Sequence, residues 1–238
     1  MKILITNDDG IGSPVLPLLA QWASKLGEVT VAAPKIEQSG KSQAIDFTNP
    51  IAITPYEILP GIQGYAVEST PADCVRFGIR GLGVEYDLVL SGINRGYNLG
   101  DDIVYSGTCG AIFESARLGT RGLAISADPE HLLEAPEALD ALWEYIQKND
   151  LYSHNPLYNV NIPPKPQGFR ITKQGGVFFT DGFIRDEGHM YVQTGEISPD
   201  SGNDPTTDIN TIRAGFVSVT PLAASRTEMS VFEKLQAI

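Results

Sequence analysis

The chain has 238 residues, of which 42% are hydrophobic and 19% are charged, a composition typical of a globular protein with a sizeable core. Its formal net charge of −12 disfavours polymeric nucleic acid as a partner, because the phosphates of DNA or RNA need a basic surface. No apolar run approaches the roughly 18 residues that span a bilayer, and the first residues lack the basic and apolar regions of a signal peptide. We therefore expect a cytoplasmic protein with no membrane partner.

The predicted elements alternate between strand and helix over the first two thirds of the chain. In chain order they are a strand at 3–6, a helix at 13–27, strands at 29–33, 51–53 and 65–67, a helix at 70–81, a strand at 88–90, a helix at 109–118, a strand at 123–125, a helix at 136–148 and a strand at 159–162. The first helix is predicted to start at the cap residue Ser13, followed by Pro14.

From residue 163 onward the composition changes to proline, glycine and aspartate. Hairpin-like segments are predicted around 176–179 and 189–192, followed by a strand at 216–220 and a short helix near Phe232. The whole pattern predicts an α/β protein of three layers, with a doubly wound, mostly parallel sheet of Rossmann type. We place the α/β core at residues 1–165 and a C-terminal extension of hairpins and tail at 166–238, within the same domain.

Two adjacent carboxylates, Asp8 and Asp9, follow the first predicted strand directly and precede Gly10. The carboxyl ends of parallel strands form the edge at which open α/β sheets bind ligands. Two carboxylates in one turn at that edge can both direct oxygen ligands at one hard cation. Aspartate also favours turns and caps helices, which is the structural alternative. The position directly after the first strand favours the metal site.

Two further loops are predicted to end at the same edge, one with Ser39 and one with Asn94. With the two carboxylates, their hydroxyl and amide oxygens make an all-oxygen ligand set, which suits Mg²⁺ or Mn²⁺ rather than zinc. The three histidines are scattered late in the chain and are interpreted as surface or loop residues. The cysteines, Cys74 and Cys109, are too few for a disulfide framework and are expected to pack in the core.

The segment Ser106-Gly107-Thr108 lies just before a predicted helix. The amides at a helix start are unpaired and carry the positive end of the helix dipole, so with hydroxyls they form an anion site that needs no basic residue. Ordinary helix capping explains the same segment equally well. Gly10 and Gly12 lack the third glycine of a dinucleotide-binding fingerprint, so that signal is weak.

Several motifs, spread in order over nearly the whole chain, recur together in one known family. They are Ile5 to Gly10, Gln38 to Gly40, Ser69 to Val75, Ser91 to Asp102, Tyr105 to Thr108, Asn159 to Pro163, Thr207-Asp208 and Val217 to Leu222. In these motifs the chain resembles the SurE (survival protein E) family. The resemblance implies a divalent-metal-dependent, acid-phosphatase-like nucleoside monophosphatase, a 5′-nucleotidase often also active on 3′-nucleotides and polyphosphate.

The resemblance also implies roles for particular residues. By position, the implied metal ligands are Asp8, Asp9, Ser39 and Asn94. The implied phosphate-contacting residues are Asn98, Ser106, Gly107 and Thr108. One divalent cation per subunit, Mg²⁺ or Mn²⁺, and a homodimer or homotetramer built through the C-terminal hairpins and tail are implied as well.

The sequence departs from the family pattern at two places in the helix after the phosphate loop. Cys109 stands where valine is commoner, and Phe113-Glu114-Ser115 replaces a usual small residue, glutamate and glycine. Both departures leave every implied ligand in place, so they bear on packing or pocket shape rather than on the chemistry.

The residues favour hydrolysis of a small phosphate monoester, with Asp8 or Asp9 taking the proton of an attacking water. An aspartyl-phosphate intermediate is the less favoured mechanism. A signalling receiver domain also carries an early acidic pair, but it needs an aspartate where this chain has Ser91-Gly92-Ile93-Asn94, and it is a much shorter domain. A nucleotide-binding module without catalysis stays open as the second alternative.

Overall fold

The structure is a computed structural model that describes residues 1–200 and 202–236. Its strands are β1 (Lys2–Thr6), β2 (Glu28–Pro34), β3 (Ile53–Leu59), β4 (Ile62–Val67), β5 (Leu88–Arg95), β6 (Arg121–Ala127), β7 (Leu157–Ile162), β8 (Phe169–Ile171), β9 (Phe179–Arg185), β10 (Tyr191–Ile197) and β11 (Val217–Pro221). Its α-helices are α1 (Leu16–Ser24), α2 (Pro71–Arg76), α3 (Gly107–Arg117), α4 (Leu139–Lys148), α5 (Leu151–His154), α6 (Asp208–Arg213) and α7 (Met229–Gln236). A π-helical turn, Phe77–Gly81, continues α2, and 3₁₀ helices cover Gly100–Val104 and Ala135–Ala138.

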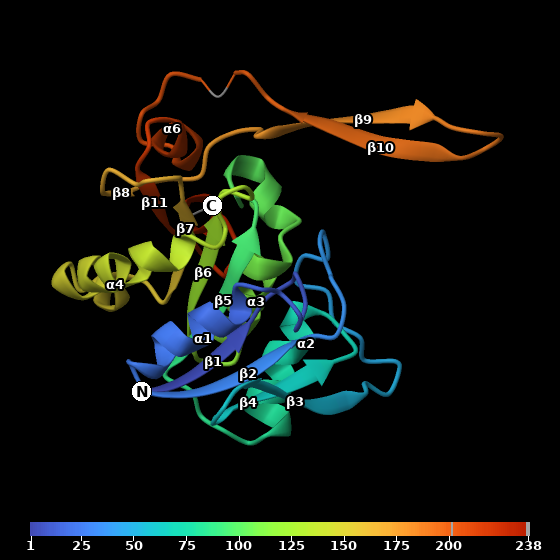
Figure 1. The fold of residues 1–238 in the computed structure, drawn as a ribbon. Helices are drawn as coiled ribbons and strands as arrows, with labels where there is room; N and C mark the ends of the chain where they lie inside the picture. Colours follow the sequence, from blue (N-terminus) through green and yellow to red (C-terminus); the bar gives the residue numbers. More distant parts are fainter. Residues whose placement is uncertain (201, 237–238) are drawn as a thin grey trace.

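A nine-stranded sheet in the order β3-β4-β2-β1-β5-β6-β7-β11-β8 forms the middle layer of the molecule (Figure 1). The strands from β4 to β7 in this order are parallel. At one edge β3 runs antiparallel to β4, and near the other β11, which lies between β7 and the edge strand β8, runs antiparallel to β7. The doubly wound, mostly parallel sheet predicted from the sequence is therefore confirmed.

Alternating side chains along β1 explain why helices cover both faces of the sheet. Ile3 and Ile5 lie in a large hydrophobic cluster that includes Leu19 of α1. Leu4, between them, lies in a second cluster on the opposite face, together with Ala111 of α3. All five side chains are fully buried, so β1 is the centre of the core. No helix within residues 1–200 and 202–236 is long and apolar enough to cross a membrane.

Two predicted boundaries at the amino-terminal half are wrong. Ser13 does not cap the first helix, which begins at Leu16, because the Leu16 amide donates to the Ser13 carbonyl oxygen in a preceding turn. The strand predicted at 51–53 begins only at Ile53 and continues to Leu59. It passes through Pro55, which a prediction reads as a breaker, but β3 is an edge strand and an edge tolerates a missing amide donor.

The strand predicted at 88–90 is also longer than expected. β5 continues to Arg95, so Asn94 belongs to the strand and not to the loop after it. The pairing of β5 with β6 shifts register between Ser91 and Asn94, which is where the regular apolar pattern stops. The irregularity keeps Asn94 at the carboxyl end of the sheet while the strand is extended.

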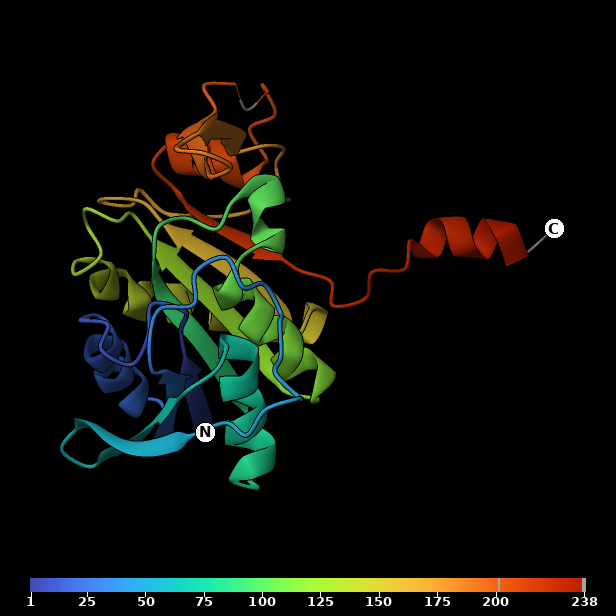
Figure 2. The same cartoon turned by 90° about the vertical axis from the view of Figure 1, so that its right-hand side faces the viewer.

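Residues 166–200 and 202–236 add two strands to the sheet and also form α6 and two projecting segments. β8 and β11, of which only β11 is predicted, extend the nine-stranded sheet beyond β7. The β9–β10 hairpin projects from the body in Figure 1, and α7 lies at the end of an extended arm in Figure 2. Both segments expose large apolar side chains, among them Phe183, Met190, Phe232 and Leu235.

Candidate functional site

The carboxyl end of β1 lies where the order of strands reverses. After β1 the chain adds β2 and β4 on one side, and it then returns to add β5, β6 and β7 on the other. Ligands of open α/β sheets bind in the crevice at such a switch point. The turn after β1 is braced by Asn7, whose side chain accepts a hydrogen bond from the Gly10 amide at 3.1 Å and donates one to the Gly10 carbonyl oxygen at 2.9 Å.

The loop that carries Ser39 lies against this turn. The amide of Gln38 donates a hydrogen bond to the carbonyl oxygen of Asp8 at 2.8 Å, which brings the neighbouring Ser39 to the side of the acidic pair that faces β2. Ser39 is exposed, and its hydroxyl donates to Glu37 Oε1 at 2.7 Å. Because the hydroxyl donates through its hydrogen, its oxygen lone pairs stay available to ligate a cation.

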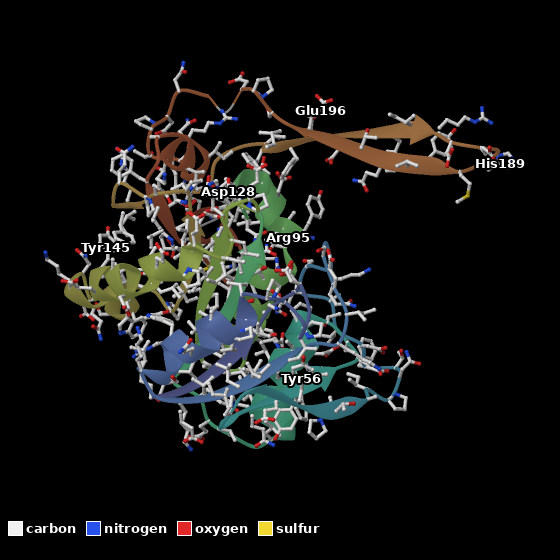
Figure 3. All side chains as sticks on the ribbon, in the orientation of Figure 1. Tyr56, Arg95, Asp128, Tyr145, His189 and Glu196 are labelled. Carbon is white, nitrogen blue, oxygen red and sulfur yellow. The ribbon has the colours of Figure 1, made fainter. Side chains whose placement is uncertain are left out.

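The last residues of β5 lie on the other side of the acidic pair. The amide of Arg95, labelled at the centre of Figure 3, donates to Asp9 Oδ2 at 3.1 Å. Asn94, which directly precedes Arg95, donates from Nδ2 to the Gly96 carbonyl oxygen at 2.8 Å. The oxygen of the same amide, Oδ1, is the atom that can ligate a cation. The three segments predicted to converge are thus cross-linked at one edge of the sheet.

Helix α3 begins directly against Asp8. The hydroxyl of Thr108 donates to Asp8 Oδ1 at 2.7 Å, and both side chains are buried. Gly107 allows this close approach, because a Cβ there would lie 3.0 Å from both Cβ and Oδ2 of Asp8. The resemblance assigns Thr108 to phosphate, whereas the structure gives its hydroxyl to Asp8, so Thr108 orients the carboxylate.

A second glycine of α3, Gly110, lets the loop after Ser39 pack onto the helix. A Cβ at Gly110 would overlap the carbonyl oxygen of Ser42. One residue further, Gln43 Nε2 donates to Glu114 Oε2 at 3.0 Å, and Glu114 also pairs with Arg117 at 2.7 Å. Burial tends to raise the pKa of Glu114, but the hydrogen bonds from Arg117 and Gln43 hold it below its usual value. Glu114, which keeps the glutamate of the family pattern between the two departing residues, thus anchors the loop.

Asp8 and Asp9 form no salt bridge in the described part of the chain. Burial raises the pKa of Asp8 to about 6; the hydrogen bond from Thr108 opposes the rise and the neighbouring Asp9 adds to it. Burial also raises the pKa of Asp9, although the nearby charge of Arg95 opposes the rise. A divalent cation would favour the charged form of both carboxylates, so the donor set fits a hard cation.

Carboxylates alone do not complete this site. The part of the chain that the structure describes contains no group of three or more His, Cys, Asp or Glu side chains that could hold a metal ion. The remaining candidate ligands are the Ser39 hydroxyl and the Asn94 amide oxygen, both neutral. This all-oxygen set suits Mg²⁺ or Mn²⁺ better than a softer metal.

Ser106 is the N-cap residue of α3. Its Oγ accepts a hydrogen bond from the amide of Cys109 at 3.0 Å, so the capping interpretation left open by the sequence describes what is observed. Capping does not exclude anion binding, because the same hydroxyl can still donate its hydrogen. The amides of Gly107 and Thr108 stand at the positive end of the helix dipole beside it.

Asn98 is held by polar side chains of β6 and β7 to which the sequence analysis gave no role at the site, although the β7 residues belong to a motif of the resemblance. Its amide donates to Asn161 Oδ1 at 2.8 Å, and its carbonyl oxygen accepts from Asn159 and Asn161 at 2.8 and 3.0 Å. Its side chain donates to Ser126 Oγ at 2.7 Å. The available signal was two asparagines in a strand buried along its whole length, where an unpaired amide is costly.

The fold and the cluster together define a doubly wound α/β protein with an oxygen-rich site at the carboxyl ends of its strands. A model of the family described as Survival protein SurE matches residues 3–181. The chain belongs to the SurE family.

Relatives over the full length agree with this assignment. A protein of Alkalilimnicola ehrlichii named 5′-nucleotidase SurE is 35% identical over 246 residues, which cover 99% of this chain and 94% of that protein. A protein of Methylococcus capsulatus with the same name is 37% identical over 249 residues, with 100% and 97% covered. The crystal structure of the SurE protein from Aquifex aeolicus matches with a TM-score of 0.83 at 31% identity, covering 100% of this chain and 99% of that one.

We predict that Asn161→Val lowers the free energy of unfolding by about 1–3 kcal/mol, because the Asn98 amide loses its acceptor and the Asn98 carbonyl loses a donor. Urea unfolding measures the loss, and hydrogen exchange at the Asn98 amide should become faster. Ser218→Ala is the matched control: Ser218 pairs with Asn161 in the sheet, and its buried hydroxyl has no hydrogen-bond partner among the described residues. Equal effects of the two variants would contradict the prediction.

Proposed function

We propose that this chain is a divalent-metal-dependent 5′-nucleotidase, which hydrolyses nucleoside 5′-monophosphates to nucleoside and phosphate. The relatives in Alkalilimnicola ehrlichii and Methylococcus capsulatus carry the name of this activity. The observation that carries the proposal is the acidic pair, Asp8 and Asp9, packed against the start of α3 at the switch point of the sheet. Metal-dependent hydrolysis of a phosphate monoester uses both parts, oxygen ligands for a cation and donors for phosphate oxygens.

The oxygen donors proposed to hold the cation are Asp8, Asp9, Ser39 and Asn94. When bound, Mg²⁺ or Mn²⁺ would supply charge neutralisation at the phosphoryl group and a lower pKa for an attacking water. One of the two carboxylates, Asp8 or Asp9, accepts the proton of that water. The hydrogen bond from Thr108 keeps Asp8 in one orientation, so the carboxylate need not reorganise during the reaction.

The donors proposed to hold the phosphate are Asn98, Ser106 and the amides of Gly107 and Thr108. Amides at a helix start and neutral side chains bind an anion without a lysine or arginine. Their positions are set before substrate arrives, since Ser106 caps α3 and Asn98 is fixed by Asn161. Fixed donors stabilise negative charge as it builds on the phosphoryl oxygens.

The family resemblance extends the proposal to 3′-nucleotides and short polyphosphate as further substrates. Release of inorganic phosphate from AMP or GMP with Mn²⁺, and none after addition of a chelator, is the direct test. A nucleotide-binding protein without catalysis would bind AMP and release no phosphate under either condition.

We predict that Asp8→Asn and Asp9→Asn each lower turnover of AMP at least about a hundredfold at saturating Mn²⁺, because each removes a charge from the cation site. Both residues lie at a strand end, so the far-ultraviolet circular dichroism should be unchanged. Asp87→Asn, at the opposite end of β5, is the matched control and should turn over AMP normally. Near-normal turnover of both site variants would refute the assignment.

We predict that Ser106→Ala weakens turnover but leaves the binding of Mn²⁺ intact, because its hydroxyl faces phosphate rather than the cation. Removing a helix cap also lowers stability by about 1 kcal/mol. Thr70→Ala, which removes the cap of α2, should lose similar stability while keeping turnover. Isothermal titration with Mn²⁺ decides the question, and loss of the isotherm in Ser106→Ala would make the serine a metal ligand instead.

We also propose that the protein assembles as a homodimer or homotetramer through the β9–β10 hairpin and α7. The hairpin exposes Phe183, Ile184, Met190, Tyr191 and Val192, and α7 has no buried residue. An isolated hairpin with an apolar face is marginally stable, so a second copy of the chain is the partner that the proposal requires. In this proposal the C-terminal extension makes the contacts between subunits.

We predict that light scattering finds a dimer or larger species at micromolar concentration. Replacing residues 183–192 by a short Gly-Ser linker should give a monomer or a smaller assembly, because it removes the exposed apolar side chains of the outer part of the hairpin and leaves, of the proposed contact surface, only those at its base and on α7. The replacement leaves the base of the hairpin, including the amide of Phe179 bound to Asp102, in place. A monomeric full-length chain would refute the assembly while leaving the metal site untouched.

A further inference from the structure

A pocket of about 630 Å³ lies between the base of the β9–β10 hairpin and the candidate site. Gly40 and Tyr105 form one wall, and Phe179 forms part of the other. Gly40 directly follows Ser39, and Tyr105 directly precedes Ser106. Two residues that line the pocket are therefore direct sequence neighbours of a proposed cation ligand and of a proposed phosphate donor.

Hydrogen bonds fix the walls of this pocket relative to one another. The amide of Ser42 donates to the Tyr105 carbonyl oxygen at 2.9 Å, which joins the loop after Ser39 to the end of the 3₁₀ helix. The amide of Phe179 donates to Asp102 Oδ2 at 2.9 Å, which joins the hairpin base to the same helix. The Phe179 ring contacts the buried ring of Phe178 edge-on, at 4.8 Å between centroids. The buried Phe178 ring thus supports the Phe179 ring on one side.

Two aromatic side chains of the pocket are nevertheless open to solvent. Tyr105 is 60% exposed and Phe179 is 39% exposed. Bases of nucleic acids and nucleotides stack on exposed rings of this kind, because every base presents a π-face. Gln193, across the hairpin, adds an amide that can pair with a base edge.

We propose that this pocket binds the nucleoside part of the substrate, with Phe179 and Tyr105 stacking on the base. The proposal rests on the proposed function, since it places the phosphate at Ser106 and the base on the hairpin side of Tyr105. It assigns the β9–β10 hairpin a role in choosing substrate in addition to the assembly role argued above.

The charge of the pocket separates nucleosides from other phosphate carriers. Asp102 and Asp181 line it, and no lysine or arginine from the described part of the chain does. Carboxylates accept hydrogen bonds from ribose hydroxyls but repel a second phosphate group. The pocket therefore favours nucleoside monophosphates over polyphosphate and over sugar phosphates that lack a base.

Kinetics of the full-length enzyme test the proposal through Phe179→Ala. This variant keeps the amide that binds Asp102, so the hairpin base stays attached. We expect the KM for AMP to rise about tenfold or more with kcat little changed. Ribose 5-phosphate, which lacks the base, should be hydrolysed equally well by the variant and by the unmodified enzyme. Phe179→Tyr, which keeps the ring, should restore the KM for AMP.

Tyr56→Ala provides the matched control. Tyr56 is an exposed aromatic residue of β3, at the edge of the sheet far from the hairpin (Figure 3). Its substitution should change neither the KM for AMP nor the hydrolysis of ribose 5-phosphate. Adenosine, which has no phosphate, gives a readout without turnover. Saturation-transfer NMR should show transfer to the adenine protons with the unmodified protein and little with Phe179→Ala.

An unchanged KM for AMP in Phe179→Ala, or an adenosine signal that survives the substitution, overturns the proposal. A variant with an unchanged KM but a smaller assembly by light scattering also overturns it, because the pocket then receives a side chain of a second copy. Failure of the unmodified protein to release phosphate from AMP would refute the proposed function instead, and the adenosine experiment would still decide the pocket.

Discussion

Two like charges side by side at the end of a buried strand are the constraint on which the rest of the site depends. Asp8 and Asp9 follow β1, the strand at the centre of the core, where little water is available to solvate them. The groups that hold them are neutral: the hydroxyl of Thr108 and the amide of Arg95. Neutral donors orient the carboxylates without cancelling their charge, which leaves the charge for a cation to satisfy.

The same constraint explains why so much nearby backbone is tied together. The turn after β1 is bound to the Ser39 loop, to the end of β5 and to the first turn of α3. Each link comes from an element adjacent to β1 in the sheet or packed on it. A site made from several short loops can be rigid in this way, because the scaffold beneath each loop is a strand or a helix.

The sequence was sufficient for the parts of this arrangement that follow from the order of strands. An apolar run followed at once by Asp8 and Asp9 locates them at a strand end, and parallel strands bring the Ser39 and Asn94 segments to the same edge. Contacts between distant elements were not predictable. Asn161 lies far from Asn98 in the chain, and they meet only because the segment after β5 passes across β6, where it contacts Ser126, and reaches β7. The strand through Pro55 was not predictable either, because proline is tolerated in an edge strand and the local sequence does not show which strand lies at the edge.

Helix α3 shows where this protein accepts a weaker element in exchange for proximity. Glycine lowers the stability of a helix by about 1 kcal/mol relative to alanine, and Gly107 and Gly110 both lie within the first turns of α3. A methyl group at either position would push away Asp8 or the carbonyl of Ser42. Engineering for thermostability by the usual exchange of helical glycine for alanine would therefore harm this helix at its most useful end. The trade-off between stability and the geometry of the site therefore lies, in this helix, in the absence of a Cβ atom at Gly107 and at Gly110.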